Sequence, residues 1–239
     1  MLNFIALTDK GLVRGNNEDS YGVDKEKRFF LLADGMGGHK AGEIASRIAV
    51  ETLTEDLQNS VITTEDDLIE ILIKSVKRAN EKIFNLSVEN NEYRGMGTTL
   101  SLIYVFDEYI YYLNIGDSRI YEISSEEIKK LTRDDSFVNY LIEIGEINEE
   151  EAKTHPKKNV LTKALGTSEN LEVHVEKEKI DKNHKYLVCS DGLTNMVEEK
   201  EIFEVTNQAN MEKSAKVLLN KALENGGIDN ITLILIYNE

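Results

Sequence analysis

Four aspartates share one setting, because each stands where an apolar, strand-like stretch stops or is about to start, beside Gly, Ser or Asn. They occur in Asp34-Gly35, Gly116-Asp117-Ser118, Ser190-Asp191-Gly192 and Asp229-Asn230. If these strand ends meet at one edge of a sheet, the carboxylates repel one another, which raises their pKa values or requires cations. Ligands that are all oxygen favour a hard octahedral ion, Mg²⁺ or Mn²⁺, over zinc. The pattern therefore predicts a divalent metal centre.

Asp34 follows the apolar run 29–33, which predicts a core strand that ends at this carboxylate. Four glycines occur in the next eight residues. An acid at the tip of a strand is held rigidly, and glycines let backbone carbonyls approach what it binds. Asp34 could instead only cap a turn, which is ordinary for an isolated Asp-Gly pair. The three similar acids favour the metal site.

The elements that must position these acids are strands in antiparallel groups, with two pairs of helices inserted. We expect strands at about 2–8, 20–23, 29–33, 100–106, 109–115, 119–123, 171–176, 186–189 and 231–237, and helices at about 42–58, from Thr64 onward, 198–205 and 211–223. This order predicts an α+β fold, a four-layer α/β/β/α sandwich of two antiparallel sheets flanked by helix pairs. The polar segment 131–160, with short helices at 137–144 and after Asn148, is expected to form a flap subdomain.

The composition indicates one domain that spans residues 1–239, because the chain has a single proline and no Ser/Gly-rich linker. The net charge of −16 repels nucleic acid and anionic membranes. No apolar stretch approaches the ~20 residues of a membrane span, and no signal peptide is recognised, so we expect a cytoplasmic protein. Cys189 is the only cysteine and lies in an apolar run, as a buried packing thiol would.

Six short motifs follow one another along the chain. They are Arg-Gly-Asn-Asn-Glu-Asp from Arg14, Asp-Gly-Met-Gly-Gly-His from Asp34, Gly-Met-Gly-Thr-Thr from Gly95, Ile-Gly-Asp-Ser-Arg from Ile115, Cys-Ser-Asp-Gly-Leu-Thr from Cys189 and Gly-Gly-Ile-Asp-Asn-Ile-Thr from Gly226. In this order they resemble the metal-dependent PPM-type (type 2C) Ser/Thr protein phosphatases, most closely the compact single-domain bacterial members. The resemblance runs from about Thr8 to the end of the chain.

The resemblance implies a set of metal ligands. Asp34 would bridge two metal ions with help from the Gly35 carbonyl, and Asp191 and Asp229 would complete the ligands of one of them. Asp117, together with Asp191, would form a weaker third metal site. The cofactors would be Mn²⁺ or Mg²⁺, two tightly bound and a weaker third.

The resemblance also implies roles for residues around the metals. Glu18 and Asp19 would hold metal-bound waters. Arg14 would bind phosphate oxygens bidentately, for which its planar guanidinium is better suited than an ammonium group. Asn159 of the flap could reach the third metal. Asn230 could belong to the site or serve only as a structural hydrogen-bonding residue.

The chain departs from the family pattern at two positions. Many members have a histidine, the proposed general acid, where this chain has Met36, and methionine cannot donate a proton. His39 is the nearest candidate for that role, although a solvated histidine in a glycine-rich loop is the alternative. Asp135 likewise stands where many relatives have a histidine.

The implied function is that of a monomeric protein serine/threonine phosphatase. A water between metals ~3.5–4 Å apart would attack the phosphorus of phosphoserine or phosphothreonine directly, without a covalent enzyme intermediate. The partners would be phosphorylated proteins, including a eukaryotic-type Ser/Thr kinase and its substrates. A non-catalytic phosphoprotein-binding module would be expected to have lost metal acids, and none is lost here. A two-metal nuclease is disfavoured by the acidic charge and the lack of a basic groove.

Overall fold

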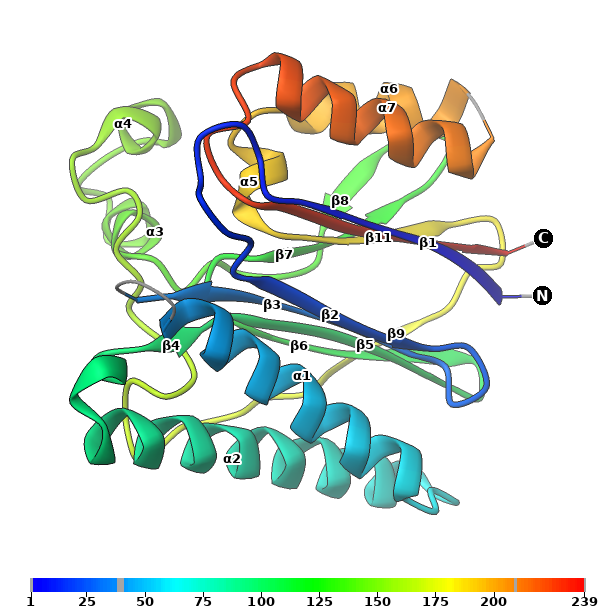
Figure 1. Cartoon of the computed structure of the whole chain (residues 1–239). Coiled ribbons are helices and arrows are strands. Elements are labelled where there is room, and N and C mark those ends of the chain that lie inside the picture. Colours follow the sequence, from blue (N-terminus) through cyan, green and yellow to red (C-terminus); the bar gives the residue numbers. More distant parts are fainter. Residues whose placement is uncertain (1, 38–40, 209, 239) are drawn as a thin grey trace.

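The structure is a computed structural model that describes residues 2–37, 41–208 and 210–238. Two antiparallel sheets lie face to face (Figure 1). One sheet has the order β2 (Asp19–Asp24), β3 (Phe29–Met36), β5 (Leu100–Phe106), β6 (Tyr109–Ile115), β9 (Glu176–Lys179), with β4 (Gly97–Thr98) paired to β3. The other has the order β1 (Leu2–Asp9), β11 (Ile231–Asn238), β10 (Lys185–Cys189), β7 (Arg119–Ile123), β8 (Ile128–Lys130).

A pair of helices covers the outer face of each sheet (Figure 1). The pair α1 (Ala41–Asn59) and α2 (Glu65–Glu89) packs on the first sheet, and the pair α6 (Glu199–Gln208) and α7 (Met211–Glu224) packs on the second. The start of α2 is a capping box, in which the Thr64 side chain accepts from the Asp67 amide and Asp67 accepts from the Thr64 amide. The predicted α+β four-layer sandwich is confirmed.

The side-chain alternation of β3 explains how the layers are filled. Phe29, Leu31 and Ala33 pack in the core beneath α1 and α2, whereas Phe30 and Leu32 pack in the core between the two sheets. Successive residues of a strand point to opposite faces. Asp34 therefore continues the row of Phe30 and Leu32 and lies at the end of the layer between the sheets.

Two details of the predicted strands are wrong. The segment 171–176 is not a strand, because its backbone pairs with β6 only from Glu176 onward. Its alternating apolar side chains, Leu171, Val173 and Val175, instead pack partly buried against the core under α1 and α2. In addition, β3 does not end at Asp34. It continues to Met36, because its last two residues pair with β4.

The flap segment (131–160) contains α3 (Phe137–Glu143) and α4 (Glu149–Thr154), with Asn148 as the N-cap of α4. Both helices lie beside the sandwich (Figure 1). The remaining short helices are η1 (Asn91–Tyr93) and α5 (Asp191–Thr194), which directly follows β10. No helix within the described residues has the length and apolarity needed to cross a membrane.

Candidate active site

Asp19 and Asp34 lie directly opposite each other in the β2–β3 pairing. Like charges at directly opposed positions of antiparallel strands repel each other. Burial, followed by the charge of Asp19, raises the pKa of Asp34 well above its usual range. Asp191, Asp117 and Asp229 raise it further. The structure therefore brings all the predicted aspartates into one electrostatic cluster, whose charges call for protons or cations.

Asp19 is the most deeply buried member of this cluster, with 8% of its surface exposed. One carboxylate oxygen, Oδ2, accepts a hydrogen bond from the Ser190 hydroxyl at 2.8 Å. The other, Oδ1, is buried and has no hydrogen-bond partner within the part of the chain that the structure describes. Burial, with added repulsion from Asp191 and Asp229, raises the pKa of Asp19 to about 7. A buried carboxylate oxygen without a donor is costly unless it is protonated or faces a cation or its waters.

The other acids reach the cluster from the ends of several strands. Asp117 lies in the turn between β6 and β7, Asp191 is the first residue of α5, and Asp229 lies two residues before β11. Burial raises the pKa of Asp117 to about 7, with a further contribution from Asp191. Burial and Asp229 raise the pKa of Asp191. Asp34, Asp117, Asp191 and Asp229 all keep part of their surface exposed, so solvent reaches the cluster.

The hydroxyl groups of Thr98, Thr99 and Ser118 hold the backbone of Asp34 in place. These residues lie within the sequence motifs, but the sequence analysis predicts no role for them. The Thr99 hydroxyl accepts from the Asp34 amide at 2.9 Å and is hydrogen-bonded to the Ser118 hydroxyl at 2.8 Å. The Thr98 hydroxyl donates to the Asp34 carbonyl at 2.9 Å. Because Ser118 follows Asp117, this chain of hydroxyls connects the two acids. Its signal in the sequence is the Thr-Thr and Asp-Ser pairs within the motifs.

Gly35 lies where the loop before β2 meets the start of α1. Its amide donates to the Glu18 carbonyl at 3.1 Å. A Cβ atom at this position would lie 2.1 Å from the Gly42 carbonyl oxygen and 2.7 Å from that of Glu18. Only glycine therefore allows this close approach of three backbone segments. The Glu18 carboxylate lies against Gly42, where a Cβ atom would be 2.4 Å from Glu18 Oε2. Burial raises the pKa of Glu18.

Asn230 connects the last strand to the loop that carries Arg14. Its side-chain amide donates to the carbonyls of Lys10 and Asn16, both at 2.9 Å, and its oxygen accepts from the Glu18 amide at 2.8 Å. The residue is 4% exposed. These bonds favour the structural alternative for Asn230: it holds the loop 10–18 against the start of β11.

Arg14 lies at the open edge of the cluster, with 51% of its side chain exposed. Its guanidinium donates to Asp229 Oδ2 at 2.8 Å. Burial alone would lower the pKa of Arg14, but the charges of Asp229, Glu18 and Asp34 outweigh it and raise that pKa. The guanidinium is therefore within electrostatic reach of the acids and also open to solvent.

The donor set is suited to a hard divalent cation, although its side chains are not arranged around one. Among residues 2–37, 41–208 and 210–238, no three acid, histidine or cysteine side chains converge in the geometry of a metal site. Asp229 is paired with Arg14, Asp191 Oδ2 accepts from the Asn195 side-chain Nδ2 at 2.9 Å, and Asp19 accepts from the Ser190 hydroxyl. The orphaned Asp19 oxygen and the mutual repulsion of the acids nevertheless fit a cation. Its binding would require some of these side chains to turn.

Residues 13–225 match the family model described as protein phosphatase 2C. The chain belongs to the protein phosphatase 2C family. The chain is 37% identical over 234 residues to the serine/threonine phosphatase stp of Listeria monocytogenes, and this match covers 96% of the chain and 93% of that protein. The crystal structure of Stp1 from Staphylococcus aureus has a TM-score of 0.94 at 36% identity and covers 100% of this chain and 96% of that chain. The catalytic domain of PstP, solved with two manganese ions, has a TM-score of 0.89 at 34% identity over 99% of this chain and 97% of that one.

The predicted family and enzyme class are thus confirmed, because the relatives of this phosphatase 2C chain are named serine/threonine phosphatases. The two manganese ions of PstP support the expected use of divalent metal cofactors.

The candidate proton donor of this family member is not placed by the structure, because His39 lies outside the described residues. Met36, at which the family resemblance led us to expect a histidine, is the last residue of β3. Its terminal methyl would lie 2.7 Å from a Cβ atom built at Gly97, so its side chain packs against β4. Met36 therefore contributes packing and no proton.

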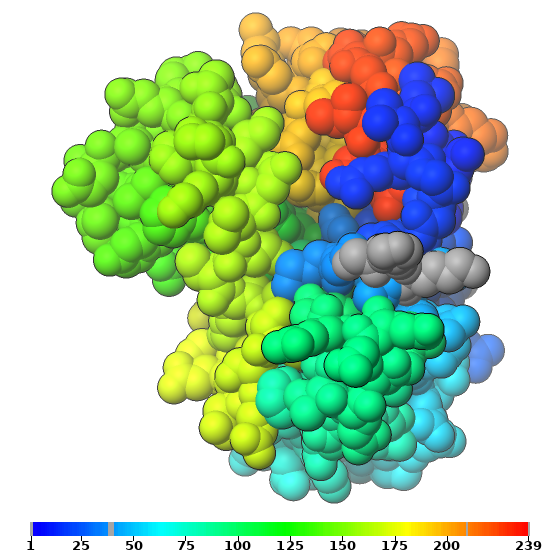
Figure 2. Space-filling view, turned by 60° about the vertical axis from the view of Figure 1, so that its left-hand side comes forward, coloured from blue at the N-terminus to red at the C-terminus, as the bar shows by residue number. Residues whose placement is uncertain are grey.

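The flap segment is fastened to the loop that carries Asp117. The Asp135 amide donates to the Gly116 carbonyl at 2.8 Å, and the Gly116 amide donates to Asp135 Oδ2 at 3.2 Å. Next to it, the Arg119 guanidinium donates to Asp134 Oδ2 through Nη2 at 2.7 Å and Nε at 3.0 Å. Figure 2 shows the surface hollowed between this segment (yellow-green) and the loop that carries Arg14 (blue).

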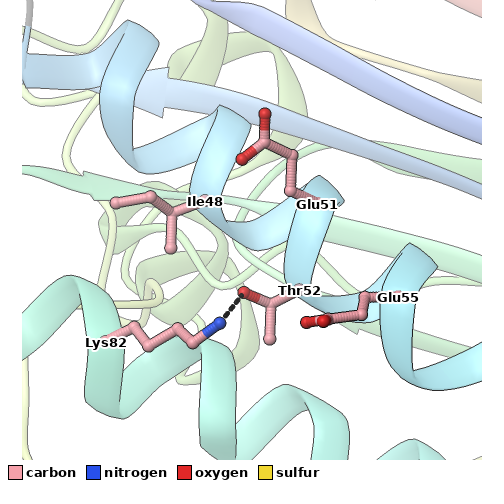
Figure 3. A pocket seen from close by; sticks show the side chains of 5 residues that line it. All are labelled: Ile48, Glu51, Thr52, Glu55 and Lys82. Atoms are coloured by element: carbon pink, nitrogen blue, oxygen red, sulfur yellow. Dashed lines mark hydrogen bonds between the residues drawn. The ribbon is translucent and has the colours of Figure 1, made fainter.

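A separate groove of about 410 Å³ lies between α1 and α2, lined by Ile48, Glu51, Thr52, Glu55 and Lys82. In Figure 3 the Lys82 ammonium points toward Thr52, to whose hydroxyl it donates at 3.1 Å. None of the acids of the phosphatase cluster lines this groove, so we place the active site at the strand ends and not here.

Proposed function

We propose that this phosphatase hydrolyses phosphoserine and phosphothreonine in proteins, using divalent cations that its strand-end aspartates hold. The observation that carries the proposal is the charge cluster centred on Asp34, in which four further aspartates raise its pKa. So many carboxylates in one place require that some hold protons or that cations offset their charge, and cations also provide for hydrolysis. Family membership supports the same conclusion.

In this proposal Asp34, the Gly35 carbonyl, Asp191 and Asp229 hold two tightly bound Mn²⁺ or Mg²⁺ ions. Asp117 holds a weaker third ion together with Asp191. When bound, such ions would supply the positive charge that activates water and offsets the charge of the substrate phosphate, for direct hydrolysis without a covalent enzyme intermediate.

Glu18 and Asp19 would hold water molecules around these ions. The orphaned Oδ1 of Asp19 supports this role, since it can accept from a water that the cluster admits. Asn230 would keep its structural role and hold the loop 10–18 in place.

Arg14 would bind the phosphate group of the substrate. Its exposed, forked guanidinium can donate two hydrogen bonds to phosphate oxygens. To do so it must exchange its bond to Asp229, and this exchange would also release an oxygen of Asp229 for metal binding. The proton for the leaving alkoxide would come from His39, the histidine nearest to Asp34 in the sequence.

We further propose that residues 1–239 form a single domain with the flap at about 131–160, and that the protein acts in the cytoplasm as a monomer. Its substrates would include a eukaryotic-type Ser/Thr kinase and the proteins that this kinase phosphorylates. The names of its relatives support phosphorylated proteins as the substrate class.

Hydrolysis assays test this proposal directly. A small aryl phosphate and a phosphothreonine peptide should both release phosphate with Mn²⁺, and EDTA should stop the release. Absence of metal-dependent release from both substrates would refute the proposed function.

A further inference from the structure

Three exposed apolar side chains lie next to the residues proposed to bind phosphate and metal. Leu12 is 69% exposed and Val13 is 67% exposed, and they lie two positions and one position before Arg14. Ile228 is 49% exposed and directly precedes Asp229. We name these three residues the apolar rim.

The two loops that carry the apolar rim are packed against each other through their backbones. The Leu12 amide donates to the Gly227 carbonyl at 2.7 Å. Gly227 has a φ of +50°, and a Cβ atom there would lie 3.0 Å from Leu12 Cγ and 3.2 Å from the Leu12 nitrogen. The Leu12 side chain therefore lies over Gly227, the residue that precedes Ile228. In Figures 1 and 2 the first loop (blue) and the loop before β11 (red) lie side by side.

The apolar rim cannot be explained by burial in the core. The Leu12 backbone is held by a hydrogen bond and a tight glycine contact, while the three side chains of the rim are exposed. Isolated apolar residues on a surface are ordinary, but a group of them beside a functional site is a candidate for ligand contact. Val61 and Val88 are also exposed apolar residues, but Val61 lies before α2 and Val88 lies near its end, so neither adjoins Arg14 or Asp229 in the sequence.

We infer that the apolar rim binds apolar side chains that flank the phosphorylated residue of a protein substrate. The inference rests on the proposed function, in which Arg14 holds the phosphate. Consecutive Cα atoms are about 3.8 Å apart, so the rim residues of the first loop lie within about 8 Å of Arg14 along the chain. The neighbours of a phosphothreonine are separated from it by the same spacing, so a substrate whose phosphate contacts Arg14 can place a flanking side chain on the rim.

The charge of the protein favours the same substrates. With a net charge of −16, the surface repels acidic flanking residues, whereas an apolar flank meets the uncharged rim. The preferred substrate is therefore a phosphopeptide with apolar residues next to the phosphorylated one, and an acidic flank should be the poorest.

The test compares phosphothreonine peptides that differ only in the residues on both sides of phosphothreonine, which are Leu, Ser or Asp. The wild-type protein should hydrolyse the Leu-flanked peptide with a kcat/KM about five- to tenfold above that of the Ser-flanked peptide, as expected when part of an apolar side chain leaves water. In Leu12→Ser/Ile228→Ser, which leaves only Val13 of the rim, this ratio should fall to about two or below. The matched control Val61→Ser/Val88→Ser removes two exposed apolar residues elsewhere and should keep the wild-type ratio.

Because the ratio is measured within each variant, a partial loss of folded protein cancels. A wild-type ratio near one would overturn the inference, as would a wild-type ratio that survives in Leu12→Ser/Ile228→Ser. The small aryl phosphate has no flanking residues, so its hydrolysis depends on the metal site and not on the apolar rim. Metal-dependent hydrolysis of the aryl phosphate together with a ratio of one would refute the apolar rim alone. No metal-dependent hydrolysis of any substrate would refute the proposed function, and this inference with it.

Discussion

Replacing Asp19 by asparagine removes one of two negative charges that face each other across β2 and β3. Asparagine can still accept the Ser190 hydrogen bond through its carbonyl oxygen, and its NH₂ group can face Asp34. We therefore expect Asp19→Asn to increase the free energy of unfolding of the metal-free protein at pH 8. The same substitution should weaken Mn²⁺ binding, since it removes a carboxylate from the site.

The magnitude follows from the raised pKa of Asp19. Folding raises the pKa of Asp19 from 3.8 to about 7. At a pH at which Asp19 is ionised, this shift corresponds to a loss of about 4 kcal/mol in the free energy of unfolding. Burying the new amide costs about 1–2 kcal/mol of this, so the net gain should be about 2–3 kcal/mol. A raised folded-state pKa contributes stability below the unfolded-state pKa, and this contribution is lost as the pH rises through the folded-state pKa. The gain should therefore shrink between pH 8 and pH 4.5.

Urea unfolding followed by far-UV circular dichroism measures this effect, with EDTA present throughout. Fluorescence is less useful because the chain has no tryptophan. Glu70→Gln, which neutralises an exposed acid of α2, serves as the control and should show no such pH-dependent gain. The electrostatic reasoning fails if Asp19→Asn is less stable than wild type at pH 8, or if the difference is the same at both pH values.

Three further substitutions test other parts of the account. Arg14→Ala should raise KM about ten- to a hundredfold, as the loss of a charged hydrogen bond predicts, while Mn²⁺ stoichiometry measured by calorimetry stays unchanged; a wild-type KM would make Arg14 a surface charge only. Asp117→Ala should lower kcat about tenfold or more at saturating Mn²⁺ while two ions still bind tightly, and an unchanged kcat would reduce Asp117 to a turn residue. Arg119→Ala leaves Asp134 with only the long contact from Lys130 at 3.4 Å and should cost about 1.5–3 kcal/mol in urea unfolding, which an unaltered transition midpoint would exclude.

The position of the aspartates at strand ends could be predicted from the sequence because it rests on local signals. An apolar run followed by an acid and a glycine is visible without knowledge of the fold, as at Asp34 and Asp191. The helix that begins after Thr64 was equally readable, since its capping box is encoded within four residues.

Other features depend on contacts between distant segments, so no local pattern reveals them. The opposition of Asp19 and Asp34 is set by strand register, and the bond from Ser190 to Asp19 joins residues far apart in the sequence. The segment 171–176 shows the reverse error. Its apolar and polar residues alternate as in a strand, but within this segment only Glu176 pairs with β6. The alternation reflects the packing of the apolar side chains against the core and not strand pairing.

The central claim is that the strand-end aspartates hold the metal ions on which hydrolysis depends. Calorimetric titration of Mn²⁺ into the wild-type protein, Asp34→Ala and Asp191→Ala tests it most directly, with phosphothreonine-peptide turnover measured on the same samples. We expect the wild-type protein to bind two ions tightly and to hydrolyse the peptide, and each variant to lose tight binding and turnover together. Wild-type Mn²⁺ stoichiometry and affinity in both variants would contradict the account.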